Sequence, residues 1–87
     1  MEEKIKELLN PKLKDLNMFV DSSVLEQENN NLFLRICLDS DETLDLNRIV
    51  EATNIINPLM DKADLVNDKY ILEVYGKSKG SDLNEKN

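Results

Sequence analysis

Four carboxylates crowd one short stretch of the chain, where they could hold a hard divalent cation such as Ca²⁺ or Mg²⁺. These acidic residues, four within seven positions, are Asp39, Asp41, Glu42 and Asp45. An EF-hand loop that began at Asp39 would need Gly where Leu44 stands and Glu where Val50 stands. Because the calcium-loop pattern fails, we expect no metal site here, and a solvated loop in which Asp45 caps a following helix.

The sequence offers little for nucleophilic catalysis, because it has one cysteine and no histidine. Without an imidazole there is no Ser-His-Asp or Cys-His pair. The nearest cation that could activate Cys37 is Arg35, on the same face of a predicted strand, and we interpret Cys37 as an inert, half-buried thiol. The two glycines of the chain cannot form a phosphate-binding loop. We therefore predict a protein that is not an enzyme and that needs no cofactor.

The composition is that of one small acidic domain, with 87 residues, 11 Lys and Arg, 18 Asp and Glu, and a formal charge of -7. This charge argues against holding nucleic acid by neutralising its phosphates, and it favours a basic protein surface as partner. No apolar run approaches the roughly 18 residues of a membrane span, and the acidic residues 1–4 do not resemble a signal peptide. We expect a cytoplasmic protein with neither a membrane nor a small-molecule substrate as partner.

A first amphipathic helix is predicted over residues 2–16, where Leu and Ile recur at intervals of three and four between Lys and Glu. Pro11 interrupts this pattern, so the helix must kink there or restart with Asn10 as its N-cap. Asn17 is suited to the left-handed conformation that ends a helix.

A second helix should begin after Asp45, which can cap it. Pro58 follows an Asn, so we expect the regular helix to end near Asn57 and Pro58 to open a short extra turn. The apolar positions that recur along this helix are Leu46, Ile49, Val50, Thr53, Ile56 and Met60.

Strands are predicted over residues 18–25, 32–39 and 70–75. The polar, Asn-rich run 26–31 between the first two indicates a hairpin connection. The order of elements is therefore α-β-β-α-β, an α+β domain whose two helices cover one face of a three-stranded sheet. We place the domain at residues 1–75 and a flexible polar tail at residues 76–87.

Alternation along the second predicted strand separates two faces. One face carries Leu32, Leu34, Ile36 and Leu38, and the other carries Phe33, Arg35, Cys37 and Asp39. In the first strand, Met18, Val20 and Val24 share one side, and in the third strand Tyr70 and Tyr75 lie on opposite faces. The face with Phe33, Arg35 and Glu73 is too mixed for a second core layer, and we interpret it as a docking surface.

Several short motifs resemble the ribosome maturation factor RimP family over about residues 5–75. The motifs, in chain order, are Leu8-Leu9-Asn10-Pro11, Leu34-Arg35-Ile36-Cys37-Leu38-Asp39, Thr43-Leu44-Asp45 and Tyr70-Ile71-Leu72-Glu73-Val74. The last is similar to the Tyr-x-Leu-Glu-Val third strand of that family. Their order and spacing resemble the N-terminal domain of RimP.

The resemblance implies a non-enzymatic domain, related in fold to prokaryotic KH domains, that acts in maturation of the small ribosomal subunit. In the family, a second, SH3-like domain makes much of the contact to a ribosomal protein. This chain has Tyr75-Gly76-Lys77-Ser78 where the family has Ser-Ser-Pro-Gly, and Leu46 where it has a second Asp. The following Arg-Pro-Leu and the second domain are not found, so we expect either a piece of a longer protein or a single-domain relative.

We therefore predict an assembly factor domain that binds the immature small (30S) ribosomal subunit, near rRNA but mainly through a basic ribosomal protein. The residues predicted to bind the partner are Phe33, Arg35, Asp39, Asp41, Glu42, Asp45 and Glu73.

Two alternatives stay open at this point. A KH-like module acting directly on rRNA would use Arg35, Lys77 and Lys79, although Gly76-Lys77-Ser78-Lys79-Gly80 has one residue too many for the GxxG clamp. A small enzyme with a divalent metal at the acidic loop would show a stoichiometric metal site.

Overall fold

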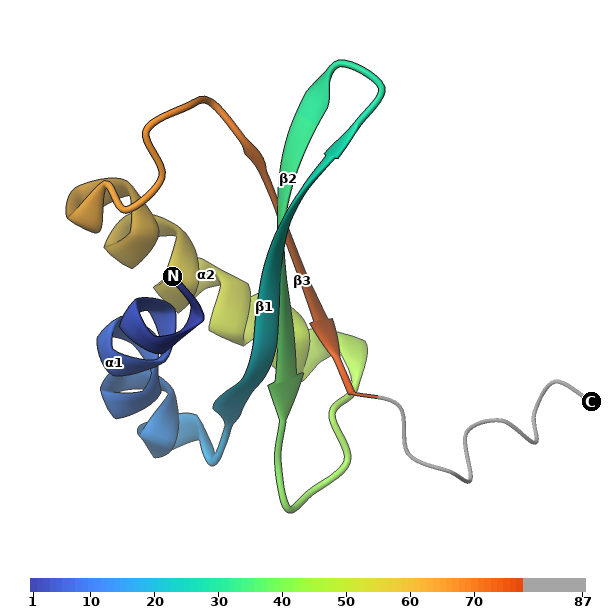
Figure 1. Cartoon of the computed structure of the whole chain (residues 1–87). Coiled ribbons are helices and arrows are strands. Elements are labelled where there is room, and N and C mark those ends of the chain that lie inside the picture. The colour runs from blue at the N-terminus through green and yellow to red at the C-terminus, as the bar shows by residue number, and fades with distance from the viewer. Residues whose placement is uncertain (78–87) are drawn as a thin grey trace, which may run out of the picture.

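The computed structural model describes residues 1–77, and it confirms the predicted order of helices and strands. The elements are helix α1 (Glu2–Leu13), a short 3-10 helix η1 (Lys14–Leu16), strands β1 (Phe19–Glu28) and β2 (Asn31–Asp39), helix α2 (Leu46–Ala63) and strand β3 (Ile71–Gly76). Figure 1 shows the two helices packed against a twisted three-stranded sheet, which is an α+β arrangement. Of the predicted polar tail, residues 78–87 lie outside the described residues.

Strand β2 is the centre of the sheet, whose order is β1-β2-β3. It pairs antiparallel with β1 and parallel with β3. A parallel neighbour needs a long crossover connection. Helix α2 provides it, because it follows β2 in the chain, packs across one face of the sheet and leads to β3 (Figure 1). Both β1 and β3 are therefore edge strands within the described part of the chain.

The hairpin between β1 and β2 is tighter than predicted. The strands pair as far as Glu28 and Asn31, so only Asn29 and Asn30 form the turn, and the predicted six-residue connection is wrong. Asn29 has φ 58, in the left-handed region that two-residue hairpin turns require and that Asn tolerates. The polar residues Glu26 and Glu28 consequently lie on a strand and not in a loop.

A register shift between Val20 and Ser22 changes which side chains of β1 face the core. Val20 lies opposite Leu38 and is 2% exposed, whereas Val24 lies opposite Arg35 and is 44% exposed. The extra residue of a β-bulge reverses the alternation of the strand beyond it. The prediction that Val20 and Val24 share one side is therefore wrong.

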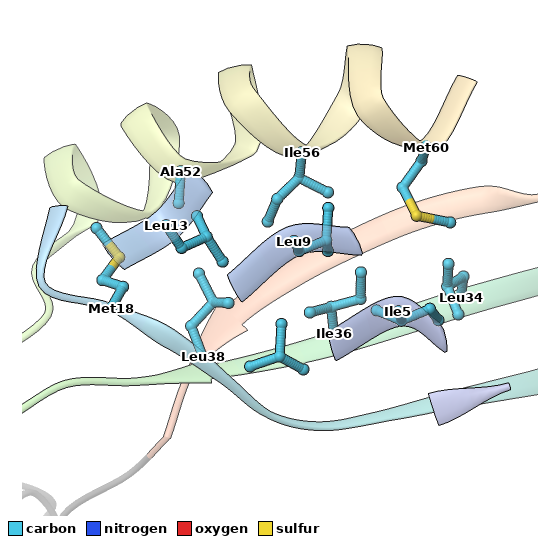
Figure 2. Close-up of a cluster of buried hydrophobic side chains, with 11 residues drawn as sticks. Ile5, Leu9, Leu13, Met18, Leu34, Ile36, Leu38, Ala52, Ile56 and Met60 are labelled. Atoms are coloured by element: carbon cyan, nitrogen blue, oxygen red, sulfur yellow. The ribbon is translucent and has the colours of Figure 1, made fainter. Parts of the chain in front are cut away.

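The core lies between the two helices and one face of the sheet. Figure 2 shows Leu34, Ile36 and Leu38 of β2 directed toward α2, as their alternation predicts. The buried residues that join them are Ile5, Leu9 and Leu13 of α1, Met18, Val20 of β1, and Ala52, Ile56 and Met60 of α2. Full burial of a side chain such as Ile36 contributes about 1.5–3 kcal/mol. This single cluster explains why both helices cover the same sheet face.

Helix α1 continues through Pro11 to Leu13, so the predicted alternative of a restart at Asn10 is wrong. The side chain of Asn10 instead accepts a hydrogen bond from the backbone N–H of Val20, with 2.8 Å between N and Oδ1. This bond ties α1 to the start of β1. Asn17 has φ 60, which confirms the predicted left-handed residue before the sheet.

Helix α2 runs past Pro58 to Ala63, so the predicted end near Asn57 is wrong. A proline in a helix interior costs a backbone hydrogen bond, but the turn beyond it places Met60 in the core at 1% exposure. Burial of Met60 offsets that loss. At the other end, Asp45 caps α2 as predicted, because its side chain accepts from the backbone N–H of Arg48.

Two of the apolar residues predicted for α2 lie outside the core. Leu46 is 75% exposed and Val50 is 50% exposed. They are four positions apart and therefore share one face of the helix.

No helix in residues 1–77 combines the length and apolar character needed to cross a bilayer.

Candidate functional site

The sheet has a second face, directed away from the helices, which we call the outer sheet face. The pairing register places its side chains: Val24, Glu26 and Glu28 of β1, Phe33, Arg35 and Cys37 of β2, and Ile71, Glu73 and Tyr75 of β3. Directly paired residues share a face, so the central β2 brings charges from all three strands together. The predicted partner-binding residues Phe33, Arg35 and Glu73 all lie here.

Arg35 is the centre of a charged cluster on the outer sheet face. Its Nε donates to Oε1 of Glu73 at 2.8 Å, and its Nη1 donates to Oε1 of Glu26 at 2.7 Å. Glu28 accepts from both Nη atoms, at 3.0 and 3.1 Å. The guanidinium also lies 4.6 Å from the ring centroid of Phe33, a cation-π contact. We call Arg35 with its three glutamates the Arg35 cluster.

The electrostatics of the Arg35 cluster follow from this geometry. The hydrogen bonds that Arg35 donates to Glu28, Glu73 and Glu26 raise its pKa above the ordinary value. In return, the hydrogen bond and the charge of Arg35 lower the pKa of Glu28. Three carboxylates outnumber one guanidinium, so the cluster is net negative. The arginine therefore organises an acidic surface and does not present a free cation.

Apolar side chains surround the Arg35 cluster. Val24 and Ile71 are each 44% exposed and Tyr75 is 47% exposed, on the two edge strands. These three side chains add apolar surface on both sides of the charged cluster. The outer sheet face can therefore contribute both apolar contact and acceptors for cations.

Cys37 lies on this face but is only 6% exposed, so it is buried and not half-buried as predicted. Burial raises the pKa of its thiol, and so does the neighbouring charge of Asp21. A thiol with a raised pKa holds little of the nucleophilic thiolate. Burial likewise raises the pKa of the Tyr75 hydroxyl beside it. Cys37 and Tyr75 therefore have the properties of packed side chains and not of a reactive site.

The other predicted partner-binding residues lie in the acidic loop, which we define as residues 39–45, from the last residue of β2 to the residue before α2. Asp45 accepts from the backbone N–H of Arg48 at 2.9 Å, and Glu42 pairs with the Arg48 guanidinium at 2.7 Å. Oδ1 of Asp39 accepts from the backbone N–H of Ser40 at 2.8 Å. These three carboxylates therefore stabilise the loop and the start of α2.

Two neighbours complete the framework of the acidic loop. The Ser40 hydroxyl donates to the carbonyl of Asn17 at 2.6 Å and accepts from the backbone N–H of Glu42 at 3.0 Å. Arg48 also donates to the carbonyl of Leu16, which joins α2 to η1. Within residues 1–77 no group of three or more His, Cys, Asp or Glu side chains could hold a metal ion.

Sequence reasoning missed Glu26 and Glu28 as members of the site. It assigned them to a connection, whereas they are strand residues whose carboxylates contact Arg35. The signal that could have found them is the Asn29-Asn30 pair, since a two-residue turn fixes the register of a hairpin. That register brings Glu26 opposite Phe33, next to Arg35.

Comparison with known protein families gives one finding for this chain. The family model of the RimP N-terminal domain matches residues 8–80, which is most of the sequence. The match includes the second half of α1, the whole sheet, the acidic loop and α2. It confirms the resemblance drawn from the sequence motifs.

Proposed function

The chain belongs to the RimP N-terminal domain family, a family of ribosome maturation factors not known for catalysis, and from this premise we propose that it binds the immature small (30S) ribosomal subunit during maturation. It does so as a non-catalytic assembly factor domain in the cytoplasm. The observation that carries the proposal is the family match over residues 8–80.

The charge of the molecule supports a basic protein as the immediate contact. The chain has a formal charge of -7, and the Arg35 cluster concentrates three carboxylates on an exposed face. Complementary charge steers association and sets specificity. We propose that a basic ribosomal protein of the immature subunit docks on the outer sheet face, with the acidic loop at its rim and rRNA nearby.

Direct recognition of rRNA by a KH-like domain is less well supported. Among residues 1–77, the arginine on the outer sheet face is Arg35, and its donors are engaged by Glu26, Glu28 and Glu73. A phosphate that bound Arg35 would have to displace those carboxylates, or their negative charge would repel it. The Lys79 of the RNA alternative lies outside the described residues.

Co-sedimentation tests the proposal. The full chain is incubated with immature small subunits, with mature small subunits and with naked rRNA, each at low and moderate salt. We expect preferential binding to immature subunits and little binding to rRNA. Equal binding to naked rRNA with a steep salt dependence would favour the RNA-binding alternative, and no binding to any of the three would contradict the proposal.

A further inference from the structure

Strand β3 presents a free edge beside an exposed apolar strip of α2. Within residues 1–77 it pairs only with β2. Its sequence Ile-Leu-Glu-Val-Tyr-Gly contains no Lys or Pro, the residues that commonly protect an edge from pairing with another strand. An unprotected edge of this kind is where an extended segment can add as a further strand.

The register shows which backbone groups face that edge. The N–H of Lys77 donates to the carbonyl of Leu38 in β2 at 2.7 Å. Backbone groups alternate in direction along a strand, so the N–H and C=O of Leu72 and Val74 are directed away from β2. The side chains of Leu72 and Val74 pack against the core at the same time. The edge therefore offers two donors and two acceptors on a well-anchored strand.

The first turns of α2 lie next to the end of β3. A Cβ placed on Gly76 would lie 3.3 Å from Cβ of Leu44 and 3.4 Å from Cδ1 of Ile49. Figure 1 shows this end of α2 beside the end of β3. A glycine at position 76 permits this close approach, so the helix and the strand edge form one continuous surface.

The exposed apolar residues of α2 belong to this surface. Successive helix residues are about 100° apart, so Arg48 and Val50 lie on opposite sides of Ile49. Arg48 reaches the carbonyl of Leu16 in η1, which leads into β1. Val50 is therefore on the side away from β1, toward the free edge of β3, and Leu46 shares that face. An added strand could cover both residues.

The occupant has to match the charge of this region. Two copies of the chain, paired through β3 about its midpoint, would bring their Glu73 carboxylates together, and each copy carries a formal charge of -7. A basic segment would instead be attracted to Glu73 and to the negative charge of the chain. Arg35 contacts Oε1 of Glu73, and the second oxygen of this carboxylate can accept from a cation on a neighbouring strand.

We propose that the free edge of β3 binds an extended, basic segment of a protein partner by strand addition. Backbone bonds to Leu72 and Val74 supply the pairing, apolar side chains of the segment cover Leu46 and Val50, and a Lys or Arg lies opposite Glu73. This inference describes how the basic ribosomal protein would bind, so it rests on the proposed function. It requires no movement of the core.

The test uses the isotope-labelled full chain and an end-blocked peptide of alternating Lys and Val, about eight residues long to match an ordinary strand. We expect amide exchange at Leu72 and Val74 to slow about tenfold or more on saturation, with NMR shift changes at Leu46 and Val50. A peptide of alternating Glu and Val should not bind. Unchanged exchange at Leu72 and Val74, at saturating peptide, would overturn the proposal.

A second peptide separates strand addition from simple charge attraction. It keeps every side chain but carries N-methyl groups on alternate backbone nitrogens, which remove the hydrogen-bond donors along one edge. We expect it to bind about tenfold more weakly or worse, which is the scale of a few lost net hydrogen bonds. Equal binding of the two peptides would overturn the proposal, because charge alone would then account for the affinity.

The protein side is tested with V74P, matched by V74A. Proline removes the edge-facing N–H and blocks the edge, a position where it is tolerated, whereas alanine removes similar packing and keeps the N–H. We expect V74P, and not V74A, to lose binding of the peptide and of immature subunits. If V74P fails to fold, the methylated peptide decides the matter.

The outcomes also separate this inference from the proposed function. If wild type and folded V74P co-sediment equally with immature subunits, strand addition is overturned and the proposed function still stands. Protection of β3 by the peptide without any binding of the chain to immature subunits would support the strand-adding edge and contradict the proposed function.

Discussion

The acidic loop and the Arg35 cluster are both rich in carboxylates, yet they use them differently. In the loop, Asp39 and Asp45 accept from backbone N–H groups of their own segment. In the cluster, the carboxylates of Glu26, Glu28 and Glu73 come from two strands and converge on one side chain of a third. The first arrangement is local in sequence, and the second depends on the assembled sheet.

This difference indicates which region is better placed to meet a partner. Carboxylates that cap a helix or close a turn stabilise the fold, and a partner that withdrew them would cost the protein about 1 kcal/mol per cap. The carboxylates of the Arg35 cluster lie on an exposed face and keep acceptor capacity while bound to Arg35. Density of acidic residues along the sequence is therefore a weaker guide to the binding surface than their convergence in space.

The largest expected effect is on binding. We compare E26K/E73K on the outer sheet face with D41K/E42K in the acidic loop, because both double reversals change the formal charge equally. We expect the outer-face variant to bind immature subunits about tenfold or more weakly, and the loop variant to lose less. Co-sedimentation measures both, after circular dichroism has shown that each variant is folded. Equal losses would mean that overall charge, and not its place, sets the affinity.

Loss of the helix cap is expected to have the next largest effect. The change D45A removes the acceptor for the backbone N–H of Arg48, and it should lower the free energy of unfolding by about 1 kcal/mol. The change D41A, in the same loop but away from the cap, is the matched control and should be close to wild type. Urea denaturation measures both, and equal stability of D45A and wild type would contradict the structural role given to Asp45.

Much of the scaffold could be predicted from local sequence alone. The alternation of Leu34, Ile36 and Leu38 requires only the period of a strand, and the cap at Asp45 and the left-handed Asn17 are properties of single residue types at helix ends. The succession of short motifs from the first helix to the third strand pointed to the family, which the match over residues 8–80 confirms.

What could not be predicted depends on contacts between distant segments. The bulge after Val20 is a shift in the register between β1 and β2, and no property of residues 18–25 alone reveals it. The helix continues through Pro58 because the turn beyond it buries Met60 in the core. The positions of Glu26 and Glu28 beside Arg35 likewise follow from hairpin register and not from their own composition.

A smaller effect is expected from removing the cation of the Arg35 cluster. In R35M the three glutamates lose their shared partner, so they repel one another and stability should fall modestly. Because salt screens exposed charges, the fall should be larger at low than at high ionic strength. The matched control is K77M, which removes a single pair with Asp21 at 3.4 Å and should change less. Thermal unfolding at two salt concentrations measures this, and a salt-independent loss in R35M would indicate lost packing on Phe33 instead.

The smallest expected effect is a pH dependence of the same cluster. Arg35 lowers the pKa of Glu28 below its ordinary value of 4.5. A carboxylate with a depressed pKa in the folded state stabilises the fold at pH above the unfolded value, and that contribution is lost as pH falls through the folded value. We therefore expect wild type to lose more stability on acidification below about 4.5 than R35M does, since R35M has no such contribution to lose. A carboxyl NMR titration should show the pKa of Glu28 rising in R35M and unchanged in K77M. An identical Glu28 titration in wild type and R35M would mean that Arg35 does not hold this carboxylate in solution, and the contrast between the Arg35 cluster and the acidic loop would lose its electrostatic basis.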